Sequence, residues 1–128
     1  MTVANVPPYD DMLWPTLQAV AELGGSASIG EIAETVIRRE GFSDAQQAVL
    51  HTNGPETEIG YRLTWARTYL KGMGLLPDSA RGVWALTDEG TALLADPSQT
   101  DELRRAKVRE LWQAHLGESR KAHGIGAA

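Results

Sequence analysis

Hydroxyl, aromatic and cationic side chains recur in the segment between Tyr61 and Arg81. Proteins use hydroxyls and cations to contact phosphates and to form hydrogen bonds with base edges. A helix turns by about 100° per residue, so the apolar residues of this segment fall on one stripe and the polar ones on the opposite face. The candidate contacts to double-stranded DNA are Tyr61, Arg62, Thr64, Trp65, Arg67, Thr68, Lys71, Ser79 and Arg81.

Five of the large side chains near this face differ in expected placement. Arg67 flanks the polar face on one side and Trp65 flanks it on the other, whereas Arg62 lies nearer the core edge and reaches outward along its stem. Trp65 either seals the helix against the following hairpin, which we favour, or meets a base. Tyr69 and Trp84 are expected in the core, where aromatic side chains usually pack.

The net charge of −5 disfavours DNA binding, but the charge is unevenly distributed. Residues 1–58 hold nine acids and two bases, whereas residues 59–81 hold four bases and one acid. Screening limits the reach of an exposed charge to about 8–10 Å, so a local cationic ridge can attract phosphate on an acidic body. We therefore expect binding that is weak and sensitive to salt.

Composition excludes several classes of protein. The 128 residues make one ordinary domain, and the absence of cysteine excludes disulfides, thiolate metal sites and a cysteine nucleophile. His51, His115 and His123 share no ligand spacing, so we expect no metal and no cofactor. No catalytic motif, no apolar run long enough for a membrane span and no secretion signal is present, which favours a non-enzymatic cytoplasmic protein.

Capping and breaking signals place the elements that carry the polar face. Helices are predicted from Tyr9 to the Gly24-Gly25 pair, over 29–40 after a capping box, and over 57–73, with a short helical piece at 43–50 between them. A hairpin follows, with strands from Leu75-Leu76 and over 83–86, and its tip carries Arg81. This order predicts a mainly α, α+β fold: a winged helix-turn-helix with an extra C-terminal helix.

The predicted domain limits follow from these elements. Residues 1–8 form a disordered lead-in, 9–95 the winged-helix domain, 96–116 a C-terminal helix and 117–128 a flexible tail. The C-terminal helix carries an apolar stripe that either packs on its own domain or pairs with a second copy in a homodimer. The candidate dimer contacts are Val108, Leu111, Trp112 and His115.

Three blocks of the chain resemble the N-terminal winged-helix domain of Mrr-type restriction proteins. They are 8–17 (PYDDMLWPTL), 63–76 (LTWARTYLKGMGLL) and 81–90 (RGVWALTDEG). The resemblance implies a DNA-recognition module, which in that family accompanies a nuclease domain that cuts modified DNA. The loop before the third helix departs from the pattern, because it carries Glu56 and Glu58 where family members often have bases.

The nuclease itself is missing from these residues, so its activity does not carry over. The chain is then either a fragment or a reader that acts with a separate nuclease subunit. We expect a regulator or the reading part of a restriction system, which binds double-stranded DNA and senses its sequence or methylation. The alternative is a protein-interaction or dimerisation module that uses the same scaffold without nucleic acid.

Overall fold

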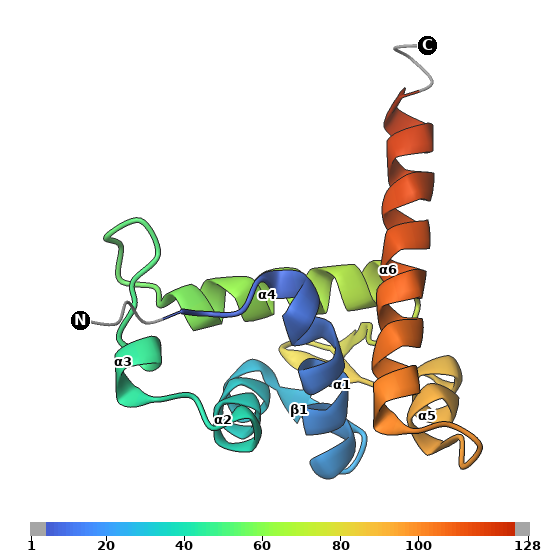
Figure 1. Ribbon diagram of the computed structural model, residues 1–128, viewed down its shortest axis with the longest axis horizontal. Helices are drawn as coiled ribbons and strands as arrows, with labels where there is room; N and C mark the ends of the chain where they lie inside the picture. The colour runs from blue at the N-terminus through green and yellow to red at the C-terminus, as the bar shows by residue number, and fades with distance from the viewer. Residues whose placement is uncertain (1–4, 125–128) are drawn as a thin grey trace.

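A computed structural model describes residues 5–124, and the side chains of residues 5–118 (Figure 1). The helices are η1 (Tyr9–Met12), α1 (Leu13–Glu22), α2 (Ile29–Glu40), α3 (Asp44–Gln47), α4 (Glu58–Gly72), α5 (Asp88–Ala95) and α6 (Asp101–Gly124). The strands are β1 (Ser26–Ser28), β2 (Asp78–Ala80) and β3 (Val83–Ala85). This order confirms the predicted α+β winged-helix class with an additional C-terminal helix.

Local capping sets the ends of the helices much as the sequence predicts. Ser28 and Glu31 form a reciprocal capping box at the start of α2, and Gly41 ends that helix in the left-handed conformation, with φ of 67°. Thr57 caps α4 by accepting a hydrogen bond from the backbone N–H of Gly60. The first predicted helix differs, because its first turn, η1, is a 3-10 helix.

The predicted hairpin is only part of a three-stranded antiparallel sheet in the order β1-β3-β2. β1 was missed, because three residues between a glycine turn and a capping box carry no strand pattern of their own. The sequence predicts a strand at Leu75 and Leu76, and this prediction is wrong. Their backbone N–H groups both donate to the carbonyl of Leu70, so they close the C-terminus of α4 and lie buried beneath it.

One core joins all the layers. α4 lies across the molecule above α1 and α2, and α6 stands upright beside its C-terminal end (Figure 1). The largest fully buried side chains come from η1, α1, α2, α4, the segment after α4 and α6: Met12, Leu13, Leu17, Val20, Ile32, Val36, Ile59, Leu63, Leu70, Leu76 and Val108. α4 is therefore fixed on its inner side along its whole length.

The two ends of the described chain are more ordered than predicted. Residues 5–8 run beside α3 and α4, since the carbonyls of Asn5 and Pro7 accept hydrogen bonds from Gln46 and Arg62. α6 continues to Gly124, whereas the sequence predicted its end near Leu116. The rest of the predicted lead-in and tail, residues 1–4 and 125–128, lies outside the described residues. Within the described range, every helix is too short or too polar to cross a membrane.

Candidate nucleic-acid interface

The outer face of α4 is uncovered over two turns. Thr64, Trp65, Thr68 and Lys71 are exposed there, opposite the buried stripe of the same helix. We call these four residues the α4 strip. α6 contacts the C-terminal end of α4, and the residues of the α4 strip remain exposed beside it. A helix that presents one open face beside a hairpin has the shape needed to enter a major groove.

The two threonines of the strip turn their hydroxyls toward the helix backbone. Thr64 Oγ1 donates to the carbonyl of Gly60 at 3.0 Å, and Thr68 Oγ1 donates to the carbonyl of Thr64 at 2.9 Å. With their protons committed in this way, both hydroxyls act toward a ligand as acceptors, accompanied by the side-chain methyl groups. The strip therefore suits base amino groups and methyl groups better than phosphate.

The sequence favours a Trp65 that seals the helix against the hairpin, and this prediction is wrong. Its side chain is 40% exposed and lies between two tyrosines of its own helix, with ring centroids 6.5 Å from Tyr61 and 5.9 Å from Tyr69. The expected burial of Tyr69 holds in part, since it is half-buried and stacks on Tyr9. The indole of Trp65 is the large apolar group of the α4 strip.

Arg67 is not on the exposed face where the sequence placed it. Only 5% of the residue is exposed, and its Cζ lies 5.4 Å from the ring centroid of the half-buried Trp84 on β3. Helical spacing put Arg67 at the edge of the polar face, but the pattern of one helix cannot show that the sheet packs against that edge. Burial lowers the pKa of Arg67, and the negative charge of Glu56 acts in the opposite direction.

The other cations of the predicted ridge are mostly paired. Arg62 donates to Glu58 at 3.0 Å and to the backbone of residues 6 and 7, and Lys71 Nζ lies 2.9 Å from Asp78 of β2. Arg81, in the β2–β3 turn, is exposed, as is Ser79. The expected cationic ridge is therefore not a set of free charges, because Glu58 at the start of α4 pairs with Arg62 and Asp78 of β2 pairs with Lys71.

The loop before α4 is held against the helix by an aromatic stack and a hydrogen bond, both made by His51. The His51 ring stacks on Tyr61 with centroids 3.5 Å apart, and its Nδ1 lies 2.9 Å from Glu58. The hydrogen bond with His51, together with Arg62, holds the pKa of Glu58 below its ordinary value. Glu58, one of the two glutamates that depart from the family pattern, is thus paired within the protein, whereas Glu56 remains exposed.

The apolar stripe of α6 packs on its own domain. Val108 is buried, and Leu111 and Trp112 lie against the core. The Trp112 ring is 5.9 Å from Tyr69, and the His115 ring sits so close to Gly72 that a Cβ there would be 2.7 Å away. Of the two roles proposed for the stripe, docking is the one that the structure shows, and these side chains are already engaged within one chain.

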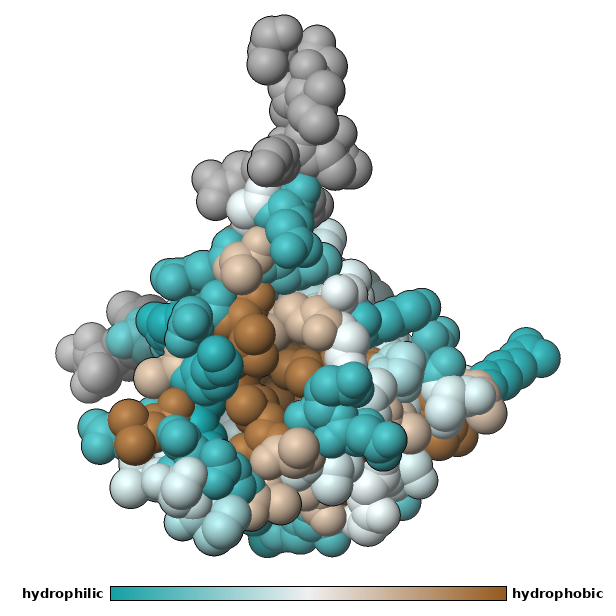
Figure 2. All heavy atoms as spheres, turned by 90° about the vertical axis from the view of Figure 1, so that its right-hand side faces the viewer, coloured by the Kyte–Doolittle hydropathy of each residue, from teal (hydrophilic) through white to brown (hydrophobic). Residues whose placement is uncertain are grey.

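The outer face around α6 carries apolar surface of its own. Viewed from the α6 side, apolar residues gather in a hollow with hydrophilic residues around it (Figure 2). Half-buried Leu93 of α5 and Leu111 of α6 line two shallow pockets on these helices. This surface is separate from the α4 strip, and the pocket at Leu93 is also lined by Asp96, Arg104 and Lys107.

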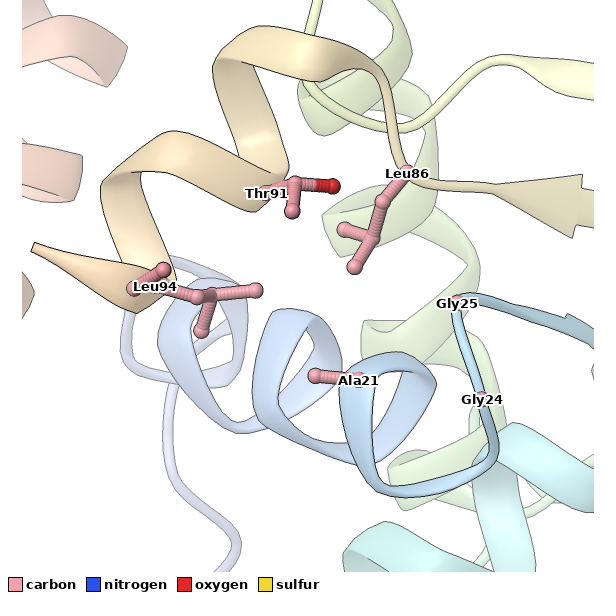
Figure 3. Close-up of a pocket in the computed structure, with 7 residues that line it drawn as sticks. Ala21, Gly24, Gly25, Leu86, Thr91 and Leu94 are labelled. Carbon is pink, nitrogen blue, oxygen red and sulfur yellow. The ribbon is translucent and has the colours of Figure 1, made fainter.

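A larger pocket lies between α1 and α5 (Figure 3). It has a volume of about 400 Å³ and is lined mainly by small or apolar residues, with Thr91 as its hydroxyl-bearing side chain. Nowhere in the described part of the chain do three or more His, Asp or Glu residues come together in a way that could hold a metal ion.

Comparison with known proteins identifies a family for this arrangement. Residues 9–96 match the family described as the Mrr N-terminal domain. Over 95 residues the chain is 32% identical to the type IV methyl-directed restriction enzyme EcoKMrr of Escherichia coli (strain K12). That alignment covers 74% of this chain and 31% of the relative, so the chain spans about a third of the relative's length. No solved structure matches the chain. The chain therefore belongs to the Mrr N-terminal domain family.

Proposed function

We propose that this chain binds double-stranded DNA by placing the α4 strip in the major groove, and that it serves as the reading part of a restriction system. Membership of the Mrr N-terminal domain family and the similarity to a restriction enzyme support that setting. The observation that carries the proposal is the open outer face of α4 next to the β2–β3 wing. The candidate contacts on the wing are Ser79 and Arg81.

The chemistry of the α4 strip favours a methylated target. Thr64 and Thr68 offer acceptor oxygens and methyl groups, and Trp65 offers an exposed indole. A methyl group on a base in the major groove finds apolar contact on such a surface, and a base amino group finds an acceptor. We infer that methylation of adenine or cytosine tightens binding. The methyl-directed character of the relative agrees with this reading.

The pairing of Lys71, the one cation of the α4 strip, has a consequence for affinity. Lys71 must leave Asp78 before it can contact a phosphate, and Arg81 is the exposed wing arginine. With few free cations, the chain neutralises few phosphates, and each contributes about −0.9 to the slope of log affinity against log salt. Affinity then depends on base contacts more than it does in a uniformly basic domain.

A duplex titration tests this function. Matched duplexes that are unmethylated, adenine-methylated or cytosine-methylated are titrated at several salt concentrations with the wild type and with Thr64→Ala/Thr68→Ala. We expect tighter binding to one methylated duplex and loss of that preference in the double variant. Thr91→Ala, on exposed α5, is the matched control and keeps the preference. A wild-type chain that binds none of the duplexes contradicts the proposal.

In this proposal, cleavage of the DNA is not a task of this chain. The chain corresponds to about a third of a restriction enzyme, and the α4 strip brings together no nucleophile, base and metal site. We propose that a nuclease outside these 128 residues cuts the DNA, whether on a separate subunit or not. Mixing the purified chain with methylated duplex should therefore give binding without strand breaks.

A further inference from the structure

Arg67 is a buried cation with an incomplete set of partners. Its Nε is buried and has no hydrogen-bond partner, and its Nη2 makes one long hydrogen bond, 3.3 Å, to Thr64 Oγ1. A guanidinium carries five N–H donors, and leaving donors of a buried charge unsatisfied is costly. Among the side chains of residues 5–118, seven other cations form ion pairs with carboxylates, and Arg67 forms none.

The place of Arg67 makes these donors useful to a ligand. The guanidinium lies between the Trp84 ring on β3 and the hydroxyl of Thr64, and Thr64 is exposed on the α4 strip. The end of the side chain therefore lies just beneath the surface, next to an exposed residue, at the junction of α4 with the wing. Burial and the packing of the Trp84 ring restrict the guanidinium, so binding an anion there costs little side-chain entropy.

The field around Arg67 also lacks a close counter-charge. The carboxylate that acts on it is that of Glu56, an exposed residue in the loop before α4, which forms no ion pair with it. A partly desolvated cation binds an anion more strongly than an exposed one does, because the local dielectric constant is lower. The arrangement suits a single anionic oxygen that approaches along the edge of α4.

We propose that Arg67, positioned by Thr64 and the Trp84 ring, is a recessed anion site whose guanidinium takes one phosphodiester oxygen of the DNA backbone, and that Glu56 competes with this phosphate. The inference rests on the proposed DNA binding and adds to it the residue that fixes the register of the wing on the duplex. Phosphate contacts position a protein on DNA, whereas base contacts specify the sequence. The α4 strip would then read bases while Arg67 holds the backbone.

A purely structural role for Arg67 predicts different behaviour. If the guanidinium only ties the wing to α4 through Trp84, its replacement lowers stability and leaves the number of neutralised phosphates unchanged. If it binds phosphate, an apolar replacement that keeps the packing reduces the salt dependence of binding. Arg67→Met is suited to this distinction, because a thioether packs well on an aromatic ring and replacing a buried charge with an apolar group is often tolerated.

The experiment measures duplex affinity against salt, with thermal unfolding of each variant. For Arg67→Met we expect about tenfold weaker binding and a log–log slope smaller by about 0.9. Arg67→Lys keeps the charge without the planar fork, so it should keep the slope and lose part of the affinity. Glu56→Gln should bind about two- to threefold more tightly, an effect of the size of one exposed charge. Glu34→Gln, an exposed glutamate on α2, should bind like the wild type.

The outcomes separate this inference from the proposed function. A wild type that binds no duplex contradicts DNA binding itself. A wild type that binds, with a folded Arg67→Met variant of unchanged slope, overturns the anion site alone. If Arg67→Met does not fold, Glu56→Gln decides: tighter binding than Glu34→Gln supports the site, and equal binding overturns it.

Discussion

The two flanks of α4 carry similar residue types in opposite states. On the flank toward residues 5–8 and η1, Arg62 has a carboxylate and two carbonyls as partners, and Tyr69 stacks on Tyr9. On the flank toward the wing, Arg67 has one long hydrogen bond and a buried, unpartnered Nε. We call these the inner flank and the wing flank.

The difference separates polar groups that stabilise the fold from polar groups that remain able to bind a ligand. On the inner flank the hydrogen-bond donors have partners within the chain, so a substitution there should lower the free energy of unfolding. On the wing flank the donors are unsatisfied or held by an exposed carboxylate, as Lys71 is by Asp78, so a change there should be felt in binding. Both flanks belong to one helix, and the same core stripe holds them.

The largest expected effect compares two tryptophans. Trp112→Ala removes a ring that packs against Tyr69 and Tyr9, so we expect a loss of about 3 kcal/mol in the free energy of unfolding, the lower end for such truncations because Trp112 is only half-buried. Trp65→Ala, on the exposed strip, should change stability by no more than about 0.5 kcal/mol and weaken duplex binding. Chemical denaturation and duplex titration measure the two quantities.

The reverse outcome would contradict the separation between the residues that stabilise the fold and the exposed α4 strip. If Trp65→Ala unfolds the domain, or if Trp112→Ala stays stable and loses DNA binding, the assignment of structure to one side and recognition to the other is wrong. Sedimentation of Trp112→Ala at several concentrations adds a further check. Because this ring is engaged within its own chain, we expect the same oligomeric state as in the wild type.

Arg62→Ala should have the next largest effect, and on stability alone. It removes the hydrogen bonds to Glu58 and to the backbone of residues 6 and 7, for a loss of about 2 kcal/mol, within the usual range for charged hydrogen bonds. The salt slope of duplex binding should match that of the wild type, since this guanidinium is already engaged. A smaller slope would place Arg62 on the DNA.

The acid side of the stability curve tests the inner flank through Glu58. Its pKa in the folded chain lies below the ordinary value of 4.5, chiefly because of the hydrogen bond with His51. A carboxyl with a lowered folded pKa contributes stability above its unfolded pKa and loses it as the pH falls through the folded value. Denaturation between about pH 3 and about pH 7 should show this loss, and Glu58→Gln should flatten it. An equally steep acid limb in Glu58→Gln would contradict the pairing.

Local signals explain which elements the sequence could predict. Ser28 and Thr57 are capping residues, and they predict the starts of α2 and α4. The end of α2 follows from Gly41. The family likeness followed from three short blocks and agrees with the matched range 9–96. β1 could not be predicted in this way, because it becomes a strand only by pairing with β3.

The candidate site was harder to predict, because its state depends on contacts between elements. Helical spacing identified Thr64, Thr68 and Lys71 as exposed, and they are. Spacing could not show that β3 brings Trp84 over Arg67 or that β2 brings Asp78 to Lys71. The prediction of a free cationic ridge is wrong for this reason. The sequence shows which side chains are charged, but it does not show which residues of other elements pair with them.

The smallest expected effect lies in the pair between Lys71 and Asp78 on the wing flank. The hydrogen bond from Lys71 lowers the pKa of Asp78, and both side chains are about half exposed, so the pair should add little to stability. Asp78→Asn frees Lys71 for phosphate, and we expect about threefold tighter duplex binding with an unchanged unfolding midpoint. Glu34→Gln removes one negative charge on α2 and controls for net charge. Equal gains in both variants would reduce the effect to overall charge, whereas a gain confined to Asp78→Asn would show that the wing carboxylate competes with DNA for Lys71.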